Sequence, residues 1–118
     1  MRDDAGYLRD ILEAIELVER YALRGRGTFE SDELVQVWIV HHIQIIGEAV
    51  RRLSQDLRTR HPEVPWVQVA AMRNVLVHDY FRIDLDEVWQ TVERDVPALK
   101  NHVQAILNQL GQLPDRDC

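Results

Sequence analysis

The sequence predicts an all-α fold, an antiparallel four- to five-helix bundle. Apolar residues recur at three- and four-residue steps over long stretches, and no stretch shows the alternation typical of a β-strand. Glycine or proline pairs interrupt the helical pattern and mark the turns. A chain of 118 residues, 46% of them hydrophobic, has room for one core. We therefore expect a single helical domain over residues 1–112, followed by a short polar tail at residues 113–118.

The first predicted helix begins at Asp3 or Asp4, because either carboxylate can accept the hydrogen bonds of a helix N-cap. Its apolar stripe runs from residue 7 to residue 22. Two glycines within residues 25–27 favour the end of this helix and a turn. A loop is expected to follow through Thr28 and Phe29.

The second predicted helix is long. Ser31-Asp32-Glu33 supplies its cap and its first-turn acids, and the apolar pattern continues to about Thr59. Between Val37 and Ile46 the apolar residues nearly encircle the helix axis. We therefore expect this helix to be the central element, buried by neighbours on more than one side. Two prolines within residues 61–65 break the pattern.

The second half of the chain predicts two further helices. The third spans Trp66 to Val77, and a turn through residues 79–82 separates it from the fourth. Asp84-Leu85-Asp86-Glu87 has the pattern of a capping box and begins the fourth helix, which Gly111 ends. Pro97 is expected to kink the fourth helix locally.

Composition excludes several classes of protein. No apolar stretch approaches the roughly 20 residues that span a bilayer, and the N-terminus lacks the order of a signal peptide, so we expect a cytoplasmic protein with no membrane partner. A single cysteine, Cys118, excludes an internal disulfide and a cysteine-rich zinc site. The net charge of −6 argues against coating nucleic acid through bulk charge. Residues 41–82 nevertheless hold six arginines against four acids, a local excess of +2.

The adjacent histidines His41 and His42 resemble a metal site at first sight. Neighbouring helical residues point about 100° apart, so the two rings cannot share one ion as two histidines four residues apart can. We expect one ring to lie at a helix interface and the other to be half exposed. No metal and no cofactor is expected from the sequence.

One segment, residues 71–81, concentrates side chains that can carry chemistry: Arg73, Asn74, His78, Asp79 and Tyr80. On an ideal helix, Arg73 and His78 would lie about 140° apart around the axis. They can converge only if His78 lies where the helix ends, or if a second copy of the chain faces the first. A structural role is the alternative, with Arg73 paired to Asp79 or Glu48 and His78 capping the helix.

Convergence of these side chains would support metal-free cleavage of RNA. A base removes the proton of the ribose 2′-hydroxyl, and the oxygen attacks the adjacent phosphorus. Histidine can act as base or acid because its ordinary pKa lies near 6.5. Arginine can hold the phosphate and stabilise the charge that develops on its oxygens. DNA lacks the attacking hydroxyl.

The run from Arg73 to Tyr80 resembles the Arg-x4-His-x-Tyr signature of the HepT-like branch of the HEPN superfamily. Its surroundings are similar to that family as well: Ile45-Ile46-Gly47-Glu48-Ala49 on the second helix, Pro65-Trp66 before the third, and residues 84–89 opening the fourth. Together these features cover nearly the whole domain in the expected order. Ala70-Ala71 departs from the pattern, because many relatives carry a glycine there.

The resemblance implies a homodimeric, HEPN-like ribonuclease toxin of a type VII-like toxin-antitoxin system. It implies that Arg73 and His78 are catalytic, in a cleft built by two protomers. It also implies that an MntA-type nucleotidyltransferase antitoxin attaches AMP to Tyr80 and thereby silences the toxin. The candidates for contact with phosphate or RNA are Asn74, Glu48 and Arg82, and Glu48 has an alternative role as a packing acid.

Two other functions stay open at this point. The chain could be a non-catalytic HEPN-like partner that binds nucleotide, RNA or a nucleotidyltransferase. The His78-Asp79 doublet could also belong to a metal-dependent phosphohydrolase, although the remaining ligands of such a site are not apparent in the sequence.

Overall fold

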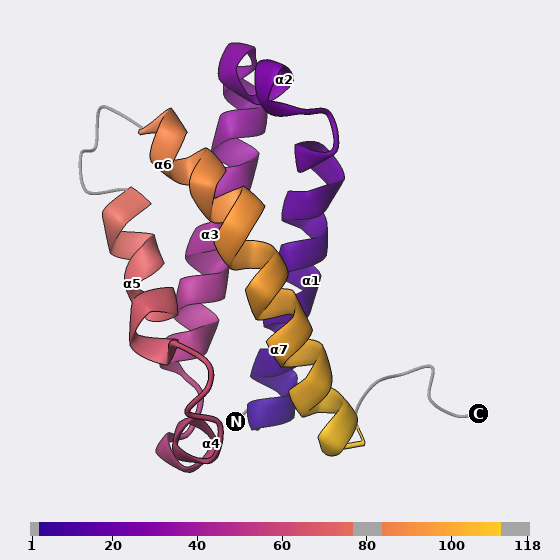
Figure 1. Cartoon of the computed structure of the whole chain (residues 1–118), viewed down its shortest axis with the longest axis vertical. Helices are drawn as coiled ribbons and strands as arrows, with labels where there is room; N and C mark the ends of the chain where they lie inside the picture. Colours follow the sequence, from indigo (N-terminus) through magenta and orange to yellow (C-terminus); the bar gives the residue numbers. More distant parts are fainter. Residues whose placement is uncertain (1–2, 77–83, 112–118) are drawn as a thin grey trace.

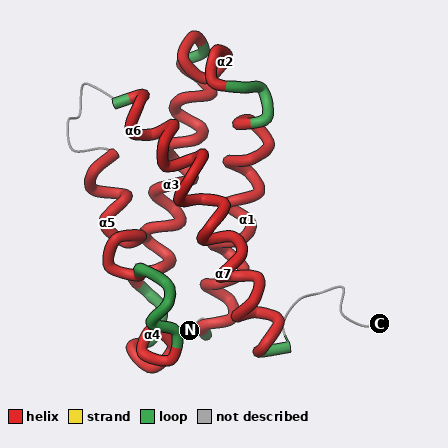
Figure 2. The backbone as a smooth tube through the Cα atoms, in the orientation of Figure 1, coloured by secondary structure: helices red, strands yellow, loops and turns green. Residues whose placement is uncertain are grey.

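A computed structural model describes residues 3–76 and 84–111, and in these ranges the chain is helical with no strand (Figure 1). The tube view shows helices joined by short loops (Figure 2). The predicted all-α class is confirmed. In chain order the elements are α1 (Asp4–Ala22), α2 (Arg26–Ser31), α3 (Glu33–Arg51), α4 (Gln55–Arg60), α5 (Trp66–Leu76), α6 (Leu85–Gln90), the π-helical turn η1 (Thr91–Asp95) and α7 (Val96–Gln109).

Helix α1 begins where its sequence predicts. Asp3 is the N-cap, and its Oδ1 accepts a hydrogen bond from the Gly6 N–H at 2.9 Å. The stripe that includes Leu8, Ile11 and Ile15 is fully buried, whereas the opposite face is polar. Burial of one continuous stripe fixes the rotation of α1 against the rest of the bundle.

The predicted loop through Thr28 and Phe29 is wrong, because these residues belong to the short helix α2. Phe29 is almost fully buried, and its ring lies 5.2 Å from the Trp89 ring of α6. Arg26 of α2 also forms an ion pair with Asp86 of α6. A six-residue helix has little stability of its own, so these contacts with a distant part of the chain hold it.

The predicted extension of the second helix to Thr59 is also wrong, because α3 ends at Arg51. Ser54 is instead the N-cap of α4, and its hydroxyl accepts from the Leu57 N–H at 3.1 Å. The Ser54 N–H and hydroxyl donate to the two carboxylate oxygens of Asp4 at 2.8 and 2.6 Å. These bonds tie the turn between α3 and α4 to the start of α1.

Helix α3 is the central element, packed along one side by α1 and along another by α5 (Figure 1). The Trp38 indole N–H of α3 donates to the Leu17 carbonyl of α1 at 3.0 Å. Burial on more than one side is thus confirmed for these two sides. On a third side, Val37 and Ile45 are 53% and 36% exposed.

The chain from α6 through η1 to α7 forms one continuous helical run across the bundle (Figure 1). Asp84 is the N-cap of α6, and its Oδ1 accepts from the Glu87 N–H at 3.1 Å, as the capping-box pattern predicts. A π-helical turn lies just before Pro97, where the sequence predicts a local kink, and the kink itself stays a prediction. Proline has no N–H to donate to the carbonyl four residues earlier, and its ring crowds that carbonyl, so the hydrogen-bond ladder shifts.

The core consists of two apolar clusters along the bundle. One is built from α1, the C-terminal half of α3, α4, α5 and α7. The other is built from the C-terminal part of α1, α2, the N-terminal half of α3, α6 and η1. Ile46 belongs to the first cluster and Ile43 to the second. Met72 of α5 packs against both, so this residue lies level with the middle of α3.

Candidate functional site

Helix α5 carries the first half of the Arg-x4-His-x-Tyr motif, and one face of it is firmly anchored. Trp66 is buried at its start, and the Trp66 indole N–H donates to the His61 carbonyl at 2.9 Å. Val69, one turn later, is buried as well. Met72 continues this stripe into the junction of the two core clusters. Packing against the core therefore holds α5 from Trp66 to Met72.

Arg73 and Asn74 lie on α5, within the four residues that end the helix at Leu76. The structure fixes their place along the backbone, whereas their side chains are not described. Predicted catalysis by Arg73 and phosphate contact by Asn74 stay predictions.

His78, Tyr80 and Arg82 lie outside the described residues, which resume at Asp84. The roles predicted for these three side chains therefore stay predictions. Both described flanks of the segment are anchored, because α5 packs on α3, and Val88 and Trp89 of α6 are buried.

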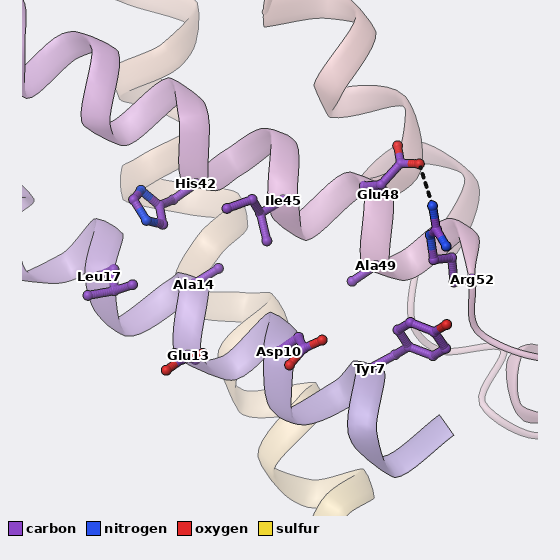
Figure 3. A pocket seen from close by; sticks show the side chains of 10 residues that line it. All are labelled: Tyr7, Asp10, Glu13, Ala14, Leu17, His42, Ile45, Glu48, Ala49 and Arg52. Carbon is purple, nitrogen blue, oxygen red and sulfur yellow. Dashed lines mark ion pairs between the residues drawn. The ribbon is translucent and has the colours of Figure 1, made fainter. Parts of the chain in front are cut away.

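Glu48 lies on α3 and lines a groove of about 450 Å³ between α1 and α3 (Figure 3). One Glu48 carboxylate oxygen lies 3.6 Å from an Arg52 guanidinium nitrogen, and both side chains are partly exposed. Across the groove, α1 contributes Tyr7, Asp10 and Glu13. Glu48 thus pairs with Arg52 and lines a groove that α1 also lines, and its predicted role beside the motif stays a prediction.

His42 points into the same groove from α3 (Figure 3). It is buried, and its Nδ1 lies 2.7 Å from the Trp38 carbonyl oxygen. Its ring is tilted by 40° against the Trp38 indole, with the ring centroids 4.5 Å apart. A carbonyl oxygen only accepts, so Nδ1 carries the hydrogen of this bond. His41 is exposed. The expectation of one interface histidine and one exposed histidine is confirmed.

The sequence did not predict this groove, nor the cavity of about 260 Å³ between α5 and α7. Gln68 and Met72 line that cavity from α5, Asp95 lines it from η1, and His102 lines it from α7. Each space is formed by helices that are distant along the chain, and no local spacing signals such a meeting.

Within residues 3–76 and 84–111, no three histidine, cysteine or acidic side chains are grouped so that they could hold a metal ion. Across the same ranges, no helix combines the length and apolar character needed to cross a membrane.

The helical bundle with an Arg-x4-His-x-Tyr segment after its central helix defines a HEPN-type domain. The family model described as ribonuclease HepT-like matches residues 11–106, from α1 into α7. This chain belongs to the HepT-like family.

Curated relatives agree with that family. A "Probable ribonuclease HepT" of Thermococcus cleftensis is 38% identical over 89% of this chain and 96% of its own length. A candidate RNase of Caldanaerobacter subterraneus is 34% identical over 92% of this chain and 98% of its own length. A Methanocaldococcus jannaschii protein, named as a gamma-glutamylcyclotransferase and candidate RNase, is 37% identical over 95% of this chain. The chain spans about half of that relative, 51% of its length. No solved structure gave a significant match.

Proposed function

We propose that this protein is a metal-independent endoribonuclease in which Arg73 and His78 act on the RNA backbone. One observation carries the proposal: the Arg-x4-His-x-Tyr motif falls inside the range matched by the ribonuclease HepT-like family, whose relatives carry ribonuclease names. An arginine and a histidine five residues apart are common by chance. Membership of the family supports a functional role for this pair.

The proposed reaction uses the 2′-hydroxyl of the RNA itself. His78 takes the proton of this hydroxyl, and the 2′-oxygen forms a bond to the adjacent phosphorus. The bond from phosphorus to the 5′-oxygen of the next nucleotide breaks, and that oxygen receives a proton. Arg73 holds the non-bridging oxygens and stabilises their growing negative charge. Asn74, Glu48 and Arg82 are the candidates for further contacts with RNA.

We further propose that the enzyme is a homodimeric, cytoplasmic toxin under the control of a nucleotidyltransferase antitoxin. The phenol of Tyr80 would attack the α-phosphorus of ATP, AMP would be attached, and pyrophosphate would leave. AMP on a tyrosine two residues after His78 adds bulk and negative charge where an RNA phosphate has to bind. The support is the tyrosine of the motif together with membership of the HepT-like family.

The test is RNA cleavage in EDTA by wild type, Arg73→Ala, His78→Ala and Tyr80→Phe, with Arg20→Ala on the exposed face of α1 as the matched charge control. Removal of a group that acts in the transition state costs roughly 10²-fold or more, so both alanine variants at the motif should lose cleavage at least to that extent. Tyr80→Phe and Arg20→Ala should keep it. An RNA with a 2′-deoxy nucleotide at the cut position should resist every variant.

Two results would replace the proposal. Cleavage that EDTA abolishes would favour the metal-dependent phosphohydrolase. Wild type that neither cuts RNA nor arrests growth, with no AMP on Tyr80 by mass spectrometry, would favour the non-catalytic binding partner. Growth arrest that Tyr80→Phe keeps even when a nucleotidyltransferase is co-expressed would support Tyr80 as the regulated residue.

A further inference from the structure

One face of α3 carries a stripe of residues that the bundle does not bury. Its residues follow one another at three- or four-residue steps and, at 100° per residue, fall within about 80° of arc on the helix surface. None of them is buried, although three are large and apolar. We call this face the α3 stripe, and it consists of Leu34, Val37, His41, Ile45, Glu48 and Arg52.

The stripe is arranged symmetrically about His41. Val37 and Ile45 lie four residues to either side of it, and Leu34 and Glu48 lie seven residues to either side. If two such helices pack antiparallel with the His41 residues facing each other, Val37 lies opposite the partner's Ile45 twice over. Ile45 also lines the groove between α1 and α3, which leaves room for an apolar side chain of a partner (Figure 3).

The charges at the two ends of α3 also favour antiparallel packing of two copies of this helix. Its N-terminal end carries Asp32 and Glu33, and its C-terminal end carries Arg51 and Arg52. An antiparallel pair places the acids of each copy beside the partner's arginines and opposes the two helix dipoles. A parallel pair would place like charges together, which costs free energy. The surface therefore complements a second copy of itself.

We propose that two copies of this chain associate through the α3 stripe, antiparallel, about a two-fold axis near His41. The inference rests on the homodimer of the proposed function and assigns the surface that forms it. Met72 lies level with the middle of α3, and Arg73 follows Met72, so the axis passes at the level of the motif helix of both copies.

Disulfide formation tests the axis directly. Packed helices lie about 8–10 Å apart, and Cα atoms lie about 2.3 Å from each helix axis, so two facing positions come within reach of a disulfide. With Cys118→Ser as background, His41→Cys should form a disulfide-linked dimer under mild oxidation. Leu23→Cys, an exposed position (87%) beyond α1, is the matched control and should stay monomeric on a non-reducing gel. Equal cross-linking of both variants would overturn the proposed axis.

Charge exchange across the interface tests the pairing of Val37 with Ile45. Val37→Glu and Ile45→Lys each place two unpaired charges in the interface, so each should weaken dimerisation about 100-fold in sedimentation equilibrium. The combined variant Val37→Glu/Ile45→Lys sets opposite charges against each other and should recover about tenfold or more. Leu23→Glu, the same kind of change outside the stripe, should leave the dimer intact.

The outcomes separate this inference from the proposed ribonuclease activity. A wild-type monomer, or a dimer that Val37→Glu and Ile45→Lys leave unchanged, overturns the α3 interface whatever the RNA assay shows. A dimer that cross-links at His41 but cuts no RNA upholds the interface and removes the ribonuclease. Loss of cleavage in Val37→Glu with recovery in the combined variant supports both, because neither residue belongs to the motif.

Discussion

Helices α1 and α3 have the same length, 19 residues, and both begin at an aspartate cap, yet they differ in how the bundle covers them. The apolar stripe of α1 is buried and its remaining face is polar, so its amphipathic pattern is satisfied within one chain. Apolar residues lie on most sides of α3, and the described part of the chain covers only some of those sides. A helix that is apolar on most sides needs more neighbours than residues 3–76 and 84–111 supply, which leaves a surface for another molecule.

Two isoleucines of α3 give the largest expected change in stability, and they test the difference between its covered and uncovered sides. Ile43 is fully buried and Ile45 is 36% exposed, so the same substitution meets opposite surroundings two residues apart. Ile43→Ala should lower the free energy of unfolding by about 2–5 kcal/mol through lost burial and a cavity. Urea denaturation should show this loss at every protein concentration.

Ile45→Ala should have a smaller effect that depends on protein concentration. If Ile45 contacts a second copy, its truncation weakens association, and the stability of a dimer varies with the amount of protein. At the lowest concentrations, where monomers dominate, its cost should fall well below that of Ile43→Ala. Equal losses from the two substitutions at all concentrations would show that α3 has no open face.

Replacement of the aspartate caps should lower stability by an intermediate amount. It tests whether α1 and α3 begin in equivalent ways. Asp3 accepts from the Gly6 N–H at 2.9 Å, and Asp32 accepts from the Leu34 N–H at 3.0 Å. Asp3→Ala and Asp32→Ala should each cost about 1 kcal/mol of stability. The matching Asn variants, which keep the accepting oxygen, should recover most of the loss in thermal unfolding. An Asn variant as unstable as its Ala counterpart would contradict the capping role.

Most helix starts could be predicted from the sequence because they depend on local chemistry. Asp3 and Asp84 cap the helices that their spacing indicates, and Trp66 begins α5 directly after a proline. Local pattern failed for α2 and α4. Burial of Phe29 against Trp89 and the hydrogen bonds from Ser54 to Asp4 join parts of the chain that are far apart in sequence.

The candidate site also has a part that local sequence could predict and a part that depends on packing between distant helices. The motif from Arg73 to Tyr80 could be found by its residue types and spacing, and the family match supports the resemblance that carries it. The groove that joins Glu48 and His42 to α1 could not be found in this way. It depends on the packing of two helices, and a sequence pattern indicates that a face is apolar without saying which element covers it.

A smaller effect concerns how α1 is held on the side away from α3. The Lys100 ammonium of α7 donates to the Glu19 carboxylate of α1 at 2.8 Å, and about a third of each side chain is exposed. An ion pair of this kind contributes less than about 1 kcal/mol and weakens with salt. Glu19→Gln should therefore lower the thermal midpoint slightly at low ionic strength and have almost no effect in 1 M salt. An effect that salt leaves unchanged would point to packing as its cause.

The smallest effect lies in the connection that leads from α3 to α5. The pKa of Glu63 is lowered from its ordinary value of 4.5, chiefly by the hydrogen bond from its own backbone N–H, with a further contribution from the His61 ring at 3.4 Å. A carboxyl whose pKa is lower in the folded protein stabilises the fold above its unfolded pKa, and this contribution disappears as the pH falls through the folded value. Wild type should thus be slightly more stable than Glu63→Gln above pH 4.5, and the difference should shrink as the solution is acidified further. A difference in thermal midpoint that grows below pH 4.5 would mean that the protonated carboxyl is the form favoured by folding, which the hydrogen bonds to its oxygens do not allow.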